Sequence, residues 1–250
     1  MPTPFMHLNM AYKLVEVSVL SGDLKELIKH HWPAFCLGNI AADFQQICDV
    51  KRRRTHFYST PPEPGDHGAF QRMLTKYPEM ASRTALEDQQ AVFYAGYGAH
   101  LIYDLVWYHN IVTVFTDGDW TDQIGRYIAH STLLAFEDQR SLKQLPEGVG
   151  TMLLEADPAG WLSFDPDECL VKWQKLVADQ LFPDAVVQTV PIFAKRMGMT
   201  ADQLADRLAD NKWMQTEVFD YASLNLVDNV LDESIEKAAK QLSNYLNNEQ

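Results

Sequence analysis

Positive charge is scarce in this chain of 250 residues. It contains 21 Lys and Arg against 34 Asp and Glu, which gives a formal net charge of −13. Duplex DNA and anionic membranes attract proteins through a basic face, so no duplex nucleic acid is expected as a partner. A phosphate ester is not excluded, because a buried metal ion could supply the positive charge that the surface lacks.

Long apolar runs are also missing. No window reaches the roughly 18 to 20 uncharged apolar residues of a membrane-spanning helix. The first twenty residues lack a basic segment, an unbroken apolar stretch and a small-residue cleavage site, so no signal peptide is expected. The sequence therefore predicts a cytoplasmic protein without a transmembrane segment.

Cysteine is rare, with only Cys36, Cys48 and Cys169. An odd number without a regularly spaced framework argues against a secreted domain held by disulfides. We expect all three to be small buried apolar residues. The chain does not need such bridges, because 46% of its residues are hydrophobic and can form a sizeable core.

Strand-like alternation is almost absent, and so are internal repeats, Gly-rich phosphate loops and any Ser/His/Asp nucleophile motif. Apolar residues recur at helical spacing instead, most clearly between residues 81 and 110. The expected fold class is all-α. We expect a metal-binding helical core over residues 1–140, a Gly/Pro-rich linker or lid over 141–165, and a helical region over 166–250 that packs on the core as one domain.

The helix expected between residues 81 and 110 carries a candidate metal-binding pair, His100 and Asp104. Residues at positions i and i+4 of a helix lie on the same face, one turn apart. Imidazole nitrogen and carboxylate oxygen both bind zinc well. The surrounding residues are apolar, which implies burial, and a buried carboxylate is costly unless it is paired or bound to a cation.

Three further residues share this buried character: His7, Asp43 and His56. Asp43 ends a run of small and apolar residues that begins at Gly38, and the lack of bulky side chains there predicts close approach by another element. Any one of these histidines alone is more often a core or cap residue, and an isolated His–Asp pair is more often a surface pair. The set of five, in four separated segments, favours a metal site.

These residues also carry a family resemblance. The order of His7, Gly38-Asn-Ile-Ala-Ala-Asp43, Thr55-His56-Phe57 and Gly96-Tyr-Gly-Ala-His100-Leu-Ile-Tyr-Asp104 resembles that of the zinc-dependent phospholipase C family. That family is all-helical and is similar in site architecture to single-strand-specific zinc nucleases. The resemblance covers roughly residues 1 to 140. It implies a multi-helix phospholipase C-like bundle, with a C-terminal helical extension in this chain.

The resemblance also implies roles for the five residues. Asp43, His56, His100 and Asp104 would surround one zinc ion, and Asp104 would bridge to a second ion that His7 also holds. Asp43 would double as the base toward the attacking water. One to three zinc ions are possible on this basis, and two are expected.

A third zinc ion in the family takes two His and a Glu. His109 lies at about the right place, although a histidine at the end of a helix also interacts favourably with the helix dipole. His130 is followed at i+4 by Leu134 in place of Glu, so Glu137 is the remaining candidate.

Two residues are candidates for substrate binding. Arg54 belongs to the basic run Lys51-Arg-Arg-Arg54, which could steer a phosphate but is more often a solvated loop. Trp107 could line a cleft, although core packing explains it equally well.

The leading functional hypothesis is zinc-dependent hydrolysis of a small-molecule or lipid phosphodiester by metal-activated water. A zinc-dependent single-strand nuclease is an alternative, although nucleic acid backbones favour a basic groove. A non-enzymatic helical protein that keeps a closed metal site is the third.

Overall fold

The computed structural model describes residues 1–117, 123–164 and 167–247, and the described residues form helices and no strand. The all-α prediction is therefore confirmed for this part of the chain. None of its helices is long and apolar enough to span a membrane.

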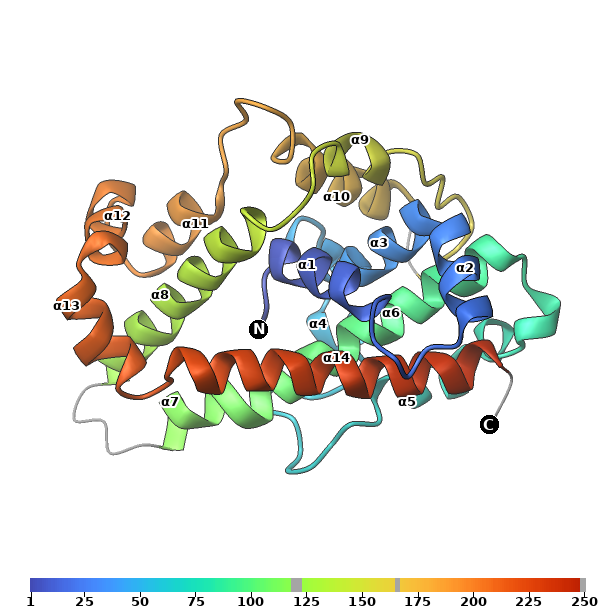
Figure 1. Cartoon of the computed structure of the whole chain (residues 1–250), viewed down its shortest axis with the longest axis horizontal. Coiled ribbons are helices and arrows are strands. Elements are labelled where there is room, and N and C mark those ends of the chain that lie inside the picture. The colour runs from blue at the N-terminus through green and yellow to red at the C-terminus, as the bar shows by residue number, and fades with distance from the viewer. Residues whose placement is uncertain (118–122, 165–166, 248–250) are drawn as a thin grey trace.

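The elements follow one another along the chain as Figure 1 shows. The α-helices are α1 (Pro4–Leu14), α2 (Gly22–His30), α3 (Trp32–Ala41), α4 (Arg52–His56), α5 (Ala69–Lys76), α6 (Asp88–Trp107), α7 (Thr113–Asp117), α8 (Gln123–Leu142), α9 (Val149–Leu153), α10 (Asp167–Asp179), α11 (Thr189–Arg196), α12 (Ala201–Ala209), α13 (Asn211–Met214) and α14 (Leu224–Leu246). The shorter turns are the 3-10 helices η1 (Ala42–Gln46), η2 (Pro78–Met80) and η3 (Arg83–Ala85), and the π-helices η4 (Tyr108–Val112) and η5 (Gln215–Phe219).

Helix α6 is the centre of the core, and its residues from Ala91 to Trp107 are all buried. It packs against α3 at a point where neither helix has a side chain. A Cβ atom on Gly38 would lie 2.1 Å from the carbonyl oxygen of Phe93, and one on Gly96 would lie 2.4 Å from that of Phe35. The close approach predicted from the small residues around Gly38 is confirmed, and the contact is with α6.

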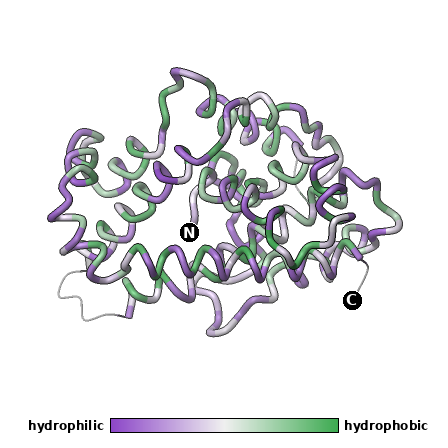
Figure 2. Tube along the Cα trace, in the orientation of Figure 1, coloured by the Kyte–Doolittle hydropathy of each residue, from purple (hydrophilic) through white to green (hydrophobic). Residues whose placement is uncertain are grey.

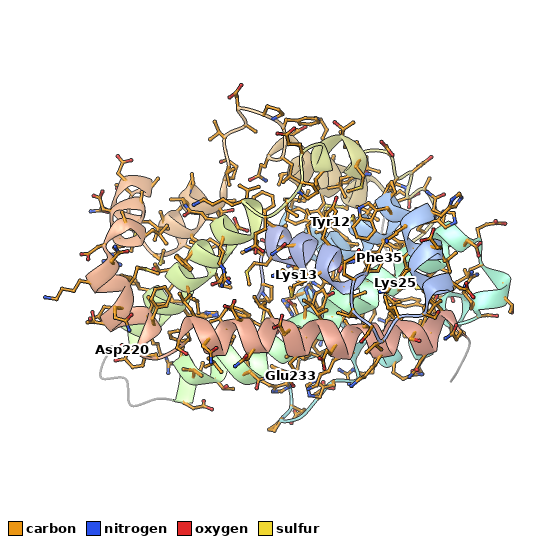
Figure 3. The ribbon with its side chains drawn as sticks, in the orientation of Figure 1. Tyr12, Lys13, Lys25, Phe35, Asp220 and Glu233 are labelled. Atoms are coloured by element: carbon orange, nitrogen blue, oxygen red, sulfur yellow. A yellow bond between two sulfur atoms is a disulfide. The ribbon has the colours of Figure 1, made fainter. Side chains whose placement is uncertain are left out.

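Helix α14 covers the other side of α6 and extends along most of the long axis of the molecule (Figure 1). Hydrophilic and hydrophobic residues alternate along it with a helical period (Figure 2), and its buried face includes Val227, Ile235 and Leu242. Figure 3 shows the same division in side chains: Phe35 lies in the interior, whereas Glu233 and Lys13 lie at the surface.

The helices differ from those predicted from the sequence in one place that matters for the site. The basic run expected to be a solvated loop forms most of α4, which also contains His56. The helix ends at His56, and the left-handed φ of 57° at the next residue, Phe57, turns the chain away. A segment of five residues has no hydrophobic period, which is why the pattern did not indicate a helix.

The C-terminal helices form two groups. Helix α10 packs against η1 and α9, and α11 and α12 pack on α8 around a small cluster of Ala135, Ala194 and Leu204. Helix α12 begins at Thr200, whose side chain and that of Gln203 form a capping box.

A disulfide joins Cys48, just after η1, to Cys169 in α10, so the expectation of three free buried cysteines is wrong for this pair. The two residues are 121 positions apart in the sequence, and only the fold brings their Cα atoms to 6.2 Å. Cys36 is free and buried, as expected.

Candidate metal centre

Three of the five predicted residues come from two helices that cross in the core. His100 and Asp104 lie one turn apart on α6, and His7 lies on α1, with all three side chains buried. The rings of His7 and His100 are stacked, with their centroids 3.9 Å apart and their planes 11° from parallel. The i, i+4 spacing places the α6 pair on one face, and the packing of α1 adds the third residue.

The other two residues come from the segment that follows α3. Asp43 lies in η1, and His56 is the last residue of α4. Both are buried, and Asp43 keeps 7% of its surface exposed. The short elements η1 and α4 therefore complete the cluster opposite His7.

The ligand atoms of the five residues converge. His56 Nε2 lies 3.4 Å from His100 Nε2, 3.5 Å from Asp43 Oδ1 and 3.4 Å from Asp104 Oδ2. His7 Nε2 lies 3.5 Å from Asp104 Oδ1. Asp104 thus presents one oxygen to His7 and the other to His56.

These separations are too long for good hydrogen bonds but suit ligands of a shared ion. Two ligands at about 2.1 Å from a tetrahedral zinc ion are roughly 3.4 Å apart. Both ring nitrogens of His7 and Oδ1 of Asp104 are buried without a hydrogen-bond partner. Buried polar atoms are rarely left without partners, and a donor set with this geometry could hold a metal ion.

Hydrogen bonds at the far side of two imidazoles orient them toward the centre. The Nδ1–H of His100 donates to the carbonyl oxygen of Asn39 at 2.8 Å. Nδ1 of His56 lies 2.8 Å from the hydroxyl oxygen of Thr55, and that hydroxyl donates to the carbonyl oxygen of Arg52. His56 must therefore donate to Thr55, and both rings are left with an Nε2 lone pair facing the cluster.

Arg52 and Tyr58 bind the carboxylate of Asp104 from outside. Arg52 Nη2 lies 2.5 Å from Asp104 Oδ2, and the Tyr58 hydroxyl donates to the same oxygen at 2.8 Å. The arginine also donates to the tyrosine hydroxyl at 2.7 Å. With two carboxylates and one arginine, the buried site has an excess of negative charge that a cation would neutralise.

Burial and charge prepare the protonation states that metal ligands need. Burial, and then the charge of His100, lower the pKa of His7 to about 4, and burial also lowers the pKa of His56 and His100. Burial alone would raise the pKa of Asp43 and Asp104, but the neighbouring histidines, joined at Asp104 by Arg52, hold both below their ordinary value. At neutral pH the imidazoles are neutral and the carboxylates ionised, as metal binding requires.

The ligand atoms form two overlapping groups that could each hold an ion, one of His7, His100 and Asp104 and the other of Asp43, His56 and His100. A cavity of about 950 Å³ reaches this centre at Asp43 and Arg52. The cluster is therefore buried but accessible from one side.

The three residues expected at a third ion have separate surroundings. The Nε2–H of His109 donates to the carbonyl oxygen of Asp66 at 3.1 Å, and its ring lies against that of His67. His130 accepts a hydrogen bond from the indole of Trp107, and burial lowers its pKa to about 3. Glu137 pairs with Arg140 at 3.3 Å. The structure brings none of these three residues to the cluster, and it does not bring any two of the three together.

The two predicted substrate-binding residues also lie elsewhere. Arg54 donates to the carbonyl oxygen of Phe164, and Trp107 is fully buried in the core. Arg52, from the same basic run, is the arginine that reaches both Asp104 and the cavity, and Trp173 is the tryptophan in the cavity wall. The spacing of Arg52 and His56, at i and i+4, was the signal that could have indicated Arg52.

The family model of zinc dependent phospholipase C matches residues 6–156, which is more than half of the chain and includes all five clustered residues. The chain belongs to this family. Comparisons with curated proteins and with solved structures return no significant match. The family match agrees with the all-helical architecture and with a cluster of His and Asp that could hold zinc.

Proposed function

We propose that this protein is a zinc-dependent phosphodiester hydrolase of the phospholipase C type. The observation that supports this most directly is the cluster of five buried ligands that faces a cavity through Asp43 and Arg52. A closed structural site would have no such open side.

Two zinc ions suit the ligand set. Asp43, His56 and His100 would hold one ion and His7 would hold the other, with Asp104 as a ligand shared by both, because it presents one oxygen to His56 and the other to His7. When bound, zinc ions neutralise charge on the phosphoryl group and lower the pKa of a water molecule so that it can attack near neutral pH. The proposal does not include a third ion.

The side chains of the chain itself perform the remaining tasks. Asp43, ionised and partly exposed to the cavity, orients the attacking water and accepts its proton. Arg52 lines the same cavity, and its Nη1 is buried without a hydrogen-bond partner. That donor is available to a phosphate oxygen, for which the guanidinium group is well suited.

The test is the substitution His100→Ala, with elemental analysis of the purified protein and turnover of dihexanoyl phosphatidylcholine. We expect about two zinc ions per chain before the change and a clear loss after it. The rate should fall by more than the roughly 100-fold that is typical of losing a residue that only orients a ligand. His30→Ala, an exposed histidine of α2, is the matched control and should change neither quantity.

Four outcomes would contradict the proposal. Protein that binds no metal would remove its basis, and full activity in His100→Ala would remove the role of the cluster. Bound zinc with turnover of single-stranded DNA and of no phospholipid would favour the nuclease, and bound zinc with no turnover of either would favour a non-enzymatic metal protein.

A further inference from the structure

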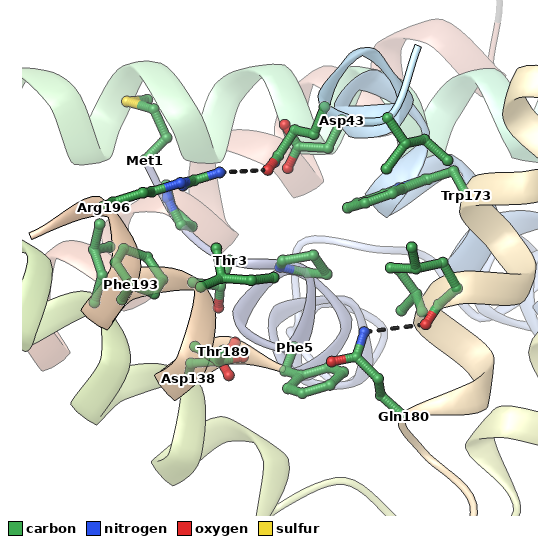
Figure 4. Close-up of a pocket in the computed structure, with 18 of the residues that line it drawn as sticks. Met1, Thr3, Phe5, Asp43, Asp138, Trp173, Gln180, Thr189, Phe193 and Arg196 are labelled. Atoms are coloured by element: carbon green, nitrogen blue, oxygen red, sulfur yellow. Dashed lines mark hydrogen bonds between the residues drawn. The ribbon is translucent and has the colours of Figure 1, made fainter. Parts of the chain in front are cut away.

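The cavity beside the metal centre is lined by residues 1–5, by residues of α8 and by two further parts of the chain that face each other across it. One wall carries Asp43, Gln46 and Arg52, which lie within the region matched by the family model. The opposite wall comes from α10 and α11, which lie beyond that region. Figure 4 shows Trp173 of α10 and Arg196 of α11 facing the same space as Asp43.

Much of the cavity wall is apolar. Its apolar lining includes Trp173, Leu176 and Val177 of α10 and Ile192 and Phe193 of α11. Leu176 and Ile192 remain 38% and 43% exposed, which is unfavourable for apolar side chains in water. A volume of about 950 Å³ lies at the upper end of the range for small-molecule pockets, so it can take the apolar part of a lipid.

The mouth of the cavity carries two adjacent cations, Lys195 and Arg196. Neither forms an ion pair with a described residue, and both are exposed. Arg196 donates to the side-chain oxygen of Gln46 at 3.3 Å, which directs it toward the wall that holds Asp43, and its guanidinium lies 5.7 Å from the ring of Phe193.

The acidic groups of the cavity do not cancel these charges. Asp43 belongs to the metal cluster and lies against His56. Asp138 is fully buried beside Thr3 and Thr189 (Figure 4), whereas Lys195 and Arg196 are exposed, and burial raises the pKa of Asp138 to about 6. The positive charge at the mouth is therefore available to a ligand.

We infer that α10 and α11 make this cavity selective for an anionic phospholipid, one whose headgroup carries no positive charge. The scissile phosphate would lie at Asp43 and Arg52, the apolar chains against α10 and α11, and the headgroup near Lys195 and Arg196. A choline or ethanolamine group in that position would meet two like charges, which disfavours it. This selectivity rests on the proposed function, but the binding of the lipid can be measured without turnover.

The experiment compares dihexanoyl phosphatidylglycerol with dihexanoyl phosphatidylcholine, both kept monomeric, on the zinc-loaded protein. We expect kcat/KM to favour the glycerol lipid by about tenfold. The double substitution Lys195→Gln and Arg196→Gln should remove most of this preference, mainly by lowering KM for the choline lipid, with zinc content unchanged.

The matched control removes the same charge from a surface outside the cavity. Lys172→Gln and Lys175→Gln are exposed positions of α10 that pair with Glu168 and Asp179 on their own helix. This double variant should keep the preference of the unmodified protein. A simple effect of net charge would make both double variants lose it, which would overturn the inference.

Failure of the inference and failure of the proposed function give different results. Turnover of both lipids at a ratio that the Lys195 and Arg196 changes leave unaltered would overturn the inference alone. If no phosphodiester is hydrolysed, calorimetric titration with each of the two lipids tests the inference. Binding that favours the glycerol lipid by about tenfold in the unmodified protein, and that loses this preference in the Lys195 and Arg196 variant, supports the inference. Equal binding of the two lipids by the unmodified protein overturns it.

Discussion

The two parts of the chain that meet at the cavity contribute different things. Residues 6–156, which the family model matches, hold all five clustered ligands on helices in close contact. Residues 167–247 hold none of them and contribute the apolar and basic wall. In the proposed function the first part would carry the chemistry, and in the further inference the second part would select the substrate.

The two parts are also held in different ways. Helices α3 and α6 touch through their backbones at Gly38 and Gly96, where no side chain can be added. Helix α10 is joined to the segment after Asp43 by one disulfide, and to the end of α3 by side chains such as Trp173, whose indole donates to the carbonyl oxygen of Ile40 at 2.8 Å. Disrupting the contact between α3 and α6 should therefore reduce metal binding, and disrupting the attachment of α10 should mainly weaken substrate binding.

The largest effect is expected from Gly38→Ala. The new methyl group would lie 2.1 Å from one backbone atom and 2.9 Å from another, so α3 and α6 must separate. We expect the free energy of unfolding to fall by more than about 3 kcal/mol. Zinc binding should be lost as well. Chemical denaturation and elemental analysis measure both. Gly22→Ala, where a Cβ has nothing within 4 Å, is the control and should be nearly neutral.

Removal of the disulfide comes next. Replacing Cys48 and Cys169 by Ser should lower the free energy of unfolding by about 2–5 kcal/mol, because the bridge closes a long loop in the unfolded chain. KM should rise while zinc content stays the same. Reductant should mimic this in the unmodified protein and have no effect on the variant. Loss of zinc in the folded variant would contradict the division between the two parts.

Asp138→Asn tests the buried acid of the cavity. Burial raises the pKa of Asp138 from 3.8 to about 6, so the folded state binds its proton more tightly than the unfolded state does. The contribution of this group to stability is present below pH 4 and is lost as the pH rises to about 6. Ionisation then costs roughly 3 kcal/mol, which the amide avoids.

The variant should therefore be more stable than the unmodified protein at pH 8 and nearly equal to it at pH 4, as followed by thermal unfolding. Asp49→Asn, an exposed position, is the control and should show no such change between the two pH values. An advantage for Asp138→Asn that is as large at pH 4 as at pH 8 would show that ionisation is not its cause.

The smallest effect is expected from Tyr58→Phe. The change removes the hydroxyl that donates to Asp104 at 2.8 Å but leaves every clustered ligand in place. Zinc affinity should fall by about 10- to 100-fold, as competition with a chelator would measure. Tyr127→Phe, at an exposed position of α8, should leave the affinity unchanged. An equal loss in both variants would show that the effect is not specific to Asp104.

The sequence predicted the fold class and the local features that depend on spacing along one helix. The pair His100 and Asp104 followed from the i, i+4 rule, and the contact at Gly38 followed from the run of small residues. His109 shows the limit of such reasoning. Nine residues of an α-helix, at about 100° each, place it roughly 180° around α6 from His100, and η4 then interrupts the helix.

Features that depend on distant segments could not be predicted. The disulfide joins residues whose separation in the sequence gives no hint of contact. The choice of Arg52 over Arg54 depends on the short helix α4, and the cavity exists only because α10 and α11 return to the N-terminal part. In each case tertiary packing, and not local periodicity, determines the result.

The bridge between Cys48 and Cys169 also makes a covalent ring of the chain between them. His56, His100 and Asp104 lie inside this ring, whereas His7 and Asp43 precede it. A protease that cuts the backbone once anywhere within the ring would leave two fragments still tied together. Such a nicked protein would migrate as one species until it is reduced, and its five ligands would remain on a single covalent molecule.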